Sequence, residues 1–142
     1  MLPAAKQVNG RFVNKVPSDI AYYLHLNNPD VIKKLQYRYR YKSVVYGLRC
    51  RIDNRTYVGS TMIAGQRFHN HLVSSIKSNA NLQAAISKYG LELFTAHIYE
   101  DVLMPVNATY QQRKAILLQR EQYYMSQFPR VQLYNKINAS NS

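Results

Sequence analysis

The chain is short of cysteine, tryptophan and long apolar runs, and the first and last of these shortages exclude whole classes of protein. Cys50 is the only cysteine among the 142 residues, so the chain can form no internal disulfide and no zinc site built from several thiolates. Cys50 falls inside a strand-like pattern, where we expect it to fill the core rather than act as a nucleophile. No hydrophobic stretch approaches the roughly 20 residues of a membrane-spanning helix, so we expect no membrane partner.

Acidic residues are scarce as well. The sequence has 7 Asp and Glu against 19 Lys and Arg, a net charge of +12 and a pI near 9.9. Such an excess is typical of proteins that bind polyanions, because each phosphate contact releases condensed counterions. The alternative is a basic protein of a mitochondrial or ribosomal setting whose charge serves solubility. With 46% hydrophobic and 18% charged residues, we expect one compact globular domain.

The N-terminal stretch and the composition bear on location. Residues 1–15 contain no acid and three basic side chains, which weakly resembles a transit peptide. Thirteen tyrosines, many asparagines and no tryptophan are typical of AT-rich coding, as in organellar or phage genomes. We therefore expect a mitochondrial or other organellar protein, with a phage or bacterial cytoplasmic protein as the alternative.

The hydrophobic periodicity predicts a mixed α/β (α+β) chain with three antiparallel strands flanked by helices, preceded by a helical and extended N-terminal segment. After an extended lead of about 17 residues, short helices are expected at 20–26 and 31–36. The strands are expected at 44–51, 55–60 and 91–99. Helices are expected from residue 64 onward, with an apolar stripe of Phe68, Leu72 and Ile76, and at 79–89 and about 110–128. A short extended segment at 132–137 closes the chain.

Residues 37–42 alternate aromatic and basic side chains. In an extended conformation, one face would carry three rings and the other three positive charges. One interpretation is an arm that stacks on bases or grips phosphates; the other is a strand whose tyrosines cover the core. The candidate nucleic-acid-binding residues are Tyr37, Arg38, Tyr39, Arg40, Tyr41 and Lys42.

The two central strands carry one tyrosine each. Asp53 and Asn54 tolerate tight-turn geometry, which favours an antiparallel hairpin. Folding at this turn would bring Tyr46 and Tyr57 close together. Gly59 follows Tyr57 by two residues, where the missing side chain would let a backbone approach closely.

The helices supply charged groups suited to phosphodiester chemistry. Arg67 and His71, one helical turn apart, could hold a phosphate and transfer a proton, whereas His69 lies off that face. Glu121 is the only carboxylate of its helix and lies on the apolar stripe. A carboxylate in that position needs a partner, which could be an arginine or a Mg²⁺ ion. Each residue alone is more often structural, so the argument rests on the set.

Five pieces of the sequence, in order, resemble the motifs of the GIY-YIG nuclease family. The stretches 44–46 (VVY) and 57–59 (YVG) resemble its paired signature. Arg67 with His71 resembles its helix motif, and Glu121 in LLQREQYYMSQF resembles its metal-binding glutamate. The stretch 134–135 (YN) resembles its closing asparagine motif, and 79–100 is similar to intron-encoded phage and organellar members. The resemblance covers residues 43–139.

The resemblance implies a three-stranded antiparallel sheet flanked by helices and a domain that hydrolyses DNA with one divalent metal ion, Mg²⁺ or Mn²⁺, bound by Glu121. Tyr46 and Tyr57 would position and activate water, with His71 assisting by proton transfer. Arg67 would hold the scissile phosphate, and Asn135 would hold local structure or substrate.

The sequence also departs from the family pattern. Val44 replaces the first glycine of the signature, and the sequence ends at Ser142 without the DNA-recognition region that homing members append. We expect an extension at 1–42, a catalytic domain at 43–139 and a polar tail at 140–142. A monomer or weak dimer on double-stranded DNA, which nicks one strand, is the leading interpretation. The alternatives are a repurposed structural component that binds RNA or the ribosome, and a structure-selective repair or recombination nuclease.

Overall fold

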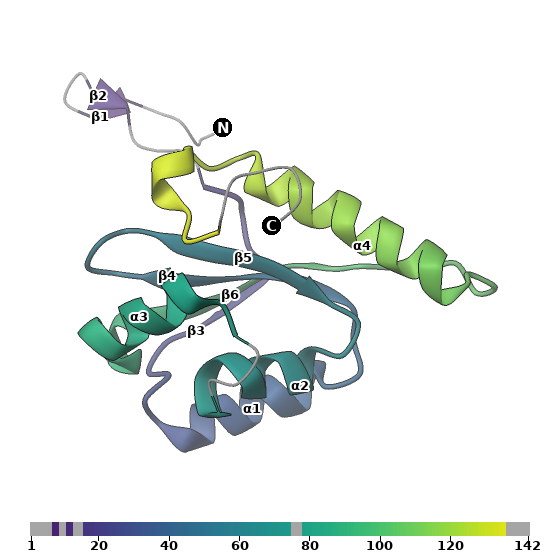
Figure 1. Ribbon diagram of the computed structural model, residues 1–142, viewed down its shortest axis with the longest axis horizontal. Helices are drawn as coiled ribbons and strands as arrows, with labels where there is room; N and C mark the ends of the chain where they lie inside the picture. The colour runs from purple at the N-terminus through teal and green to yellow at the C-terminus, as the bar shows by residue number, and fades with distance from the viewer. Residues whose placement is uncertain (1–6, 9–10, 13–15, 75–77, 136–142) are drawn as a thin grey trace.

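The computed structural model describes residues 7–8, 11–12, 16–74 and 78–135. Figure 1 shows a sheet with helices α1, α2 and α3 over one face and helix α4 over the other. The elements are β1 (Gln7–Val8), β2 (Arg11–Phe12), β3 (Ala21–Tyr23), α1 (Pro29–Tyr39), β4 (Val44–Cys50), β5 (Thr56–Thr61), α2 (Ala64–His69), the π-helix η1 (Asn70–Ser74), α3 (Ala80–Tyr89), the 3₁₀ helix η2 (Leu91–Leu93), β6 (Phe94–Asp101), α4 (Tyr110–Met125) and the 3₁₀ helix η3 (Arg130–Gln132).

The central sheet confirms the mixed α+β class but corrects the number of strands. Four strands pair antiparallel in the order β3-β6-β4-β5, so the expectation of three strands is wrong. β1 and β2 form a separate two-stranded pair. β5 is an edge strand, with one side open to the segment that follows η3.

The additional strand is β3, which lies where a helix was expected at 20–26. Ala21 pairs with Ile98 and Tyr23 with Ala96 of β6, and the Ile20 amide donates to the Ile98 carbonyl at 2.8 Å. Three residues of paired backbone cover what would otherwise be the open edge of β6. The helix prediction failed because this pairing partner lies more than 70 residues away in sequence and overrides local propensity.

Helix α1 overturns the extended interpretation of residues 37–42. Asn28 caps the helix by accepting a hydrogen bond from the Asp30 amide, and Pro29 occupies its first turn. Ile32, Leu35 and Tyr39 form its buried face. The chain is therefore helical as far as Tyr39, and the alternating aromatic and basic side chains do not lie on opposite faces of a strand.

The hairpin of β4 and β5 is confirmed. Its turn contains Asn54 in the left-handed region, at φ 66°. Tyr46 of β4 pairs with Gly59 of β5. Tyr46 and Tyr57 lie on the face covered by α1, α2 and α3, whereas Val58 packs with the core under α4.

The remaining helices follow the predicted order with shifted ends. α2 continues into the π-helix η1, and Ile76 lies outside the described residues. α3 is confirmed, with Asn79 as its cap and Gly90 at φ 88° after it. The 3₁₀ turn η2 delays the start of β6 to Phe94, and α4 ends at Met125.

Two apolar cores lie on the two faces of the sheet. The larger contains Leu35, Tyr46, Phe68 and Cys50, which confirms Cys50 as a core residue. The smaller contains Val58, Tyr99, Leu117 and Phe128 beneath α4. Residues before position 43 contribute β3 and α1 to the same sheet and core, while the division at residue 43 itself stays a prediction. Within the described residues, no helix has the length and apolar character to cross a bilayer.

Candidate active site at the edge strand β5

Tyr46 lies at the centre of a buried aromatic cluster. Its ring is fully buried, 5.1 Å between centroids from Phe68 and 6.3 Å from Tyr57. Its hydroxyl Oη lies 2.7 Å from His71 Nε2, and the two share a hydrogen bond. Burial raises the pKa of Tyr46 well above 10, and the neighbouring Tyr57 adds to the increase. Tyr46 is therefore a neutral phenol, held by its neighbours and screened from bulky substrates.

Gly59 makes room for that hydroxyl. A Cβ on Gly59 would lie 2.5 Å from Tyr46 Oη, closer than any real Cβ contact. The sequence indicated a close approach at Gly59, but a side-chain hydroxyl rather than a backbone makes it. The glycine of the second signature stretch thus positions the tyrosine of the first.

His71 is buried and neutral. Its Nδ1 lies 2.7 Å from Ser78 Oγ, and Gln83 donates to both Ser78 Oγ and the His71 carbonyl. Burial and, to a lesser extent, the positive charge of Arg67 together lower the pKa of His71 from 6.5 to about 3. A histidine with this pKa is a poor proton acceptor at neutral pH, so the geometry favours a role in orienting Tyr46.

Tyr57 is slightly more exposed than Tyr46, and both tyrosines interact with Arg67. It is 7% exposed, and its hydroxyl accepts a long hydrogen bond of 3.5 Å from Arg67 Nη2. Burial acts to lower the pKa of Arg67, but the two tyrosines outweigh it and the pKa is raised. Arg67 stays charged, and together with Tyr57 it forms the cationic side of the site.

Glu121 approaches the same strand edge from helix α4. It is only 9% exposed, and its Oε1 accepts a 2.8 Å hydrogen bond from Ser60 Oγ, on the residue after Gly59. Burial raises the pKa of Glu121, while the hydrogen bonds with Ser60 and the charge of Arg67 act in the opposite direction. The site therefore straddles β5, with Tyr57 and Arg67 on one side and Glu121 on the other.

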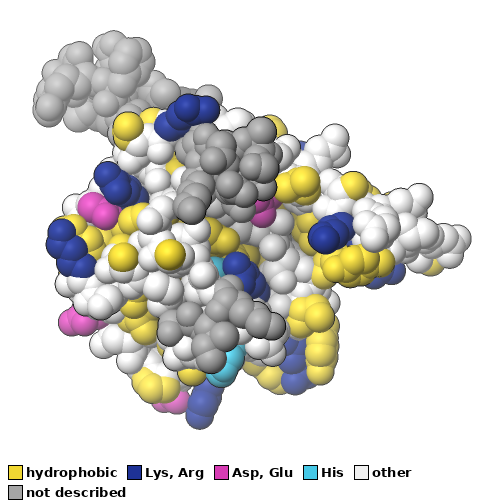
Figure 2. Space-filling view, in the orientation of Figure 1, with side chains coloured by type: hydrophobic (Ala, Val, Ile, Leu, Met, Phe, Trp, Pro, Cys, Tyr) yellow, Lys and Arg dark blue, Asp and Glu magenta, His cyan; other side chains and the backbone are white. Residues whose placement is uncertain are grey.

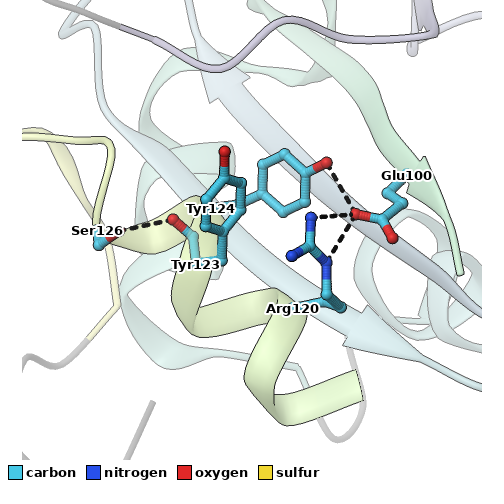
Figure 3. A network of polar contacts seen from close by, with 5 residues as sticks. All are labelled: Glu100, Arg120, Tyr123, Tyr124 and Ser126. Carbon is cyan, nitrogen blue, oxygen red and sulfur yellow. Dashed lines mark hydrogen bonds and ion pairs between the residues drawn. The ribbon is translucent and has the colours of Figure 1, made fainter. Parts of the chain in front are cut away.

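A charged network fixes α4 to the sheet and thereby positions Glu121. Figure 3 shows Glu100 of β6 facing Arg120 and Tyr124 of α4. Glu100 Oε1 accepts from Arg120 Nε at 2.9 Å, from Arg120 Nη2 at 2.7 Å and from Tyr124 Oη at 2.9 Å. Because Arg120 directly precedes Glu121, this anchor limits how far the carboxylate can move.

The surroundings of Glu121 fit a weakly coordinated divalent ion. A mostly buried carboxylate whose pKa is raised by burial gains from a cation. In the described part of the chain, no cluster of three or more His, Cys, Asp or Glu could form a closed metal cage. One carboxylate with several waters is a pattern that Mg²⁺ accepts.

Asn135 completes the edge of β5. Its side chain accepts from the Val58 amide at 2.9 Å and donates to the Val58 carbonyl at 2.8 Å, as a neighbouring strand would. The preceding residue, Tyr134, bonds through its amide to the Thr56 carbonyl and through its hydroxyl to Asp53. Asn135 thus lies beside Tyr57 and supports the strand that carries it; residues 136–137 of the expected tail segment lie outside the described residues.

The structure does not bring residues 37–42 together as one binding face. Tyr39 is buried whereas Tyr37 and Tyr41 are exposed, so the three rings do not share one face as they would in an extended segment. Lys42 is ion-paired with Asp101 at 3.2 Å. Tyr37, Arg40 and Tyr41 cluster at one side of α1, and Arg38 projects separately over Tyr39.

The sequence did not predict several residues that support the candidate site. Ser60, Ser78, Gln83 and Glu100 each hold a site residue or its helix. Isolated polar residues of this kind carry no periodic signal. The one available hint was the position of Ser60 directly after the second signature stretch.

The face of the molecule that Figure 2 shows carries more basic than acidic side chains. Figure 2 shows Lys and Arg side chains scattered over the face that displays α2, α3 and α4, with few Asp and Glu side chains among them. The sequence has only 7 acids, and Glu100 and Asp101 are already paired with cations. This face favours a polyanionic partner.

Comparison with known proteins identifies one relevant relative. Over 76 residues, 54% of this chain, the sequence is 38% identical to a protein from the fungus Neurospora crassa named "Probable intron-encoded endonuclease 1". The matched region spans 25% of the length of that protein. No protein-family model matches the chain, and no solved structure matches it. Because the match covers only part of both proteins, nuclease activity, GIY-YIG membership, metal dependence and a mitochondrial location stay predictions for this chain.

Proposed function

We propose that this protein is a divalent-metal-dependent DNA endonuclease of the homing type, with a GIY-YIG-like site that hydrolyses a phosphodiester bond. The observation that carries the proposal is the convergence of Tyr57, Arg67 and Glu121 on edge strand β5. These residues bring together a phenol, a cation and a buried carboxylate in a chain whose net charge is +12. The name of the Neurospora relative, an intron-encoded endonuclease, supports the same reaction class.

The residues divide into groups that touch the substrate and groups that position them. Arg67 has the planar donors that bind a phosphate in bidentate fashion and stabilise the negative charge of the transition state. Tyr57, which accepts a hydrogen bond from Arg67 and is slightly more exposed than Tyr46, is the tyrosine that we assign to orienting the attacking water. Tyr46 and His71 are buried, and their 2.7 Å hydrogen bond keeps the aromatic cluster rigid beneath Tyr57.

Glu121 is the residue that would hold the metal ion. A Mg²⁺ or Mn²⁺ ion there would supply Lewis-acid stabilisation of the leaving oxygen. Ser60 holds one carboxylate oxygen in place, and the raised pKa of Glu121 means that metal binding releases protons at low pH.

A structural role in binding RNA or the ribosome is the second candidate, and the net charge of +12 favours it equally. The two candidates differ in one respect: a repurposed domain does not need a carboxylate at position 121. The buried Glu121, held by Ser60 with its pKa raised by burial, therefore favours the enzyme. An organellar location fits either candidate and is part of the proposal.

The decisive experiment is plasmid cleavage. Purified protein is incubated with supercoiled plasmid and Mg²⁺ or Mn²⁺, beside Glu121→Gln and Arg67→Ala. Glu92→Gln, which removes an exposed carboxylate of η2 outside the proposed site, serves as the matched control. We expect metal-dependent nicking that Glu92→Gln retains and both site variants lose. Tight nucleic-acid binding without nicking by the unaltered protein would reject the enzyme in favour of the structural role.

A further inference from the structure

A shallow, open groove of about 560 Å³ lies between helices α1 and α2, and the proposed chemistry does not use it. We call it the α1–α2 groove and define it by Lys33, Tyr37, Arg40, Tyr41, Gln66 and His69. Its volume falls within the range of ligand sites, roughly 300–1,000 Å³. Figure 2 shows basic and hydrophobic side chains next to one another in the region of α1 and α2.

The charge of the groove is of one sign. Lys33 and Arg40 line it, and no Asp or Glu is found among the described residues of its wall. A concave surface with cations and no carboxylate attracts phosphates.

The aromatic side chains of the groove are accessible. Tyr37 is 70% exposed and Tyr41 is 80% exposed. The Arg40 guanidinium lies 4.5 Å from the Tyr37 ring centroid and 4.8 Å from that of Tyr41, so the three groups hold one another in place. Accessible tyrosines beside cations are the elements with which proteins bind single strands, because unpaired bases expose their faces for stacking. Bases inside a duplex expose only their edges.

The groove is rigidly attached to the active site. A Cβ on Gly65 of α2 would lie 2.9 Å from Arg40 Cβ, and Gln36 Nε2 donates to the Gly65 carbonyl at 3.3 Å. The two helices therefore pack at close range. Gln66 lines the groove, and the next residue, Arg67, bonds to Tyr57.

We propose that the α1–α2 groove binds unpaired nucleotides of the DNA substrate beside the scissile bond, with bases stacked on Tyr37 and Tyr41 and phosphates on Lys33 and Arg40. The inference rests on the proposed function and adds a substrate class to it: DNA that is branched or locally unpaired next to the cut. Such a nuclease prefers a junction or a bubble to a continuous duplex.

Binding without cleavage tests the stacking part of the proposal. The unaltered protein, Tyr37→Ala and Tyr37→Phe are titrated in EDTA with a fluorescent oligothymidine and with a duplex of equal length. Tyr37→Ala is expected to weaken single-strand binding at least fivefold and duplex binding less than twofold, whereas Tyr37→Phe retains both. Tyr110→Ala removes a tyrosine of similar exposure on α4 and should leave both affinities unchanged.

Two arginines of α1 provide a matched pair that tests whether the groove binds phosphates. Arg40→Ala and Arg38→Ala remove the same charge from the same end of α1, but only Arg40 lines the groove. We expect Arg40→Ala to reduce the slope of log affinity against log salt for the single strand by about 0.7, and Arg38→Ala to leave it unchanged.

Each outcome decides between the proposals. Equal effects of Tyr37→Ala and Tyr110→Ala, or equal losses for duplex and single strand, would overturn the groove proposal. Thermal melts check that each variant is folded. If Tyr37→Ala does not fold, Tyr37→Phe is compared with the unaltered protein instead. Loss of single-strand binding in Tyr37→Ala, together with no plasmid nicking by the unaltered protein, would leave the groove standing and remove the nuclease.

Discussion

Buried, neutral His71 should make the stability of this protein fall steeply in mild acid. Its pKa is 6.5 when exposed and about 3 in the folded protein, because burial and the charge of Arg67 oppose protonation. The folded state therefore takes up this proton only near pH 3, whereas the unfolded chain takes it up below pH 6.5. The stability that His71 contributes is fully present above pH 6.5 and is lost as pH falls towards 3.

The size of the effect follows from the separation of the two pKa values. A pH of about 4.5 lies about two units below the pKa of this histidine in the unfolded chain. Protonation therefore stabilises the unfolded state there, whereas the folded state is not yet protonated. At about 1.36 kcal/mol per unit, this lowers the free energy of unfolding by about 2.7 kcal/mol relative to about pH 7.5. Because His71 is only 1% exposed, screening by solvent does not reduce this effect.

Urea unfolding followed by far-UV circular dichroism measures this loss. The unaltered protein and His71→Gln are compared at several pH values between about 7.5 and 4.5. His71→Gln is less stable at neutral pH, but its stability should fall by about 2.7 kcal/mol less over this range. Taking the difference between the two proteins cancels the contributions of groups that are common to both.

A matched control is His69→Gln, which removes a partly exposed histidine of the same helix. Any change that comes only from replacing an imidazole with an amide on this segment appears in this variant too. Parallel curves for the unaltered protein and His71→Gln, or an NMR titration of His71 with a midpoint near 6.5, would refute the buried neutral histidine. The same results would restore His71 as a candidate proton acceptor at neutral pH.

Three further variants test the support of the site. Gly59→Ala should displace the Tyr46 hydroxyl, costing about 1–3 kcal/mol and most of the plasmid cleavage; a stable, active variant would contradict the close approach. Asn135→Ala should lose about 1–3 kcal/mol for each group of Val58 left unpaired, measured by urea unfolding, and an unchanged midpoint would exclude its role as an edge cap. Glu100→Ala should change stability by no more than about 1 kcal/mol yet slow cleavage several-fold, because α4 loses its anchor; equal cleavage rates would show that α4 is held in other ways.

The sequence determined the local elements whose signals lie within a few residues. Alternating apolar residues around Asp53 and Asn54 specify the hairpin, since these two residues tolerate tight turns. Asn79 and Gly90 bracket α3 because each satisfies helix-end groups that have no partner inside the helix. The order of the site residues along the chain was sufficient to select Tyr57, Arg67 and Glu121 as candidates.

Only the tertiary structure decided which long-range partners prevail. β3 is a strand because β6 offers it an open edge, and α1 extends to Tyr39 because its buried stripe fits the core. Neither partner is visible within the segment concerned. The protonation state of His71 is equally non-local, since it depends on burial beneath residues from distant parts of the chain.

The tertiary structure also decided the different roles of the site residues. Two tyrosines that are equivalent in the motif differ in the structure, where Tyr46 is fully buried and bonded to His71, whereas Tyr57 is 7% exposed and bonded to Arg67. Ser60 reaches Glu121 only because β5 and α4 pack together. A sequence specifies which groups are available, whereas burial and distance, which set their pKa values and contacts, exist only once the chain has folded.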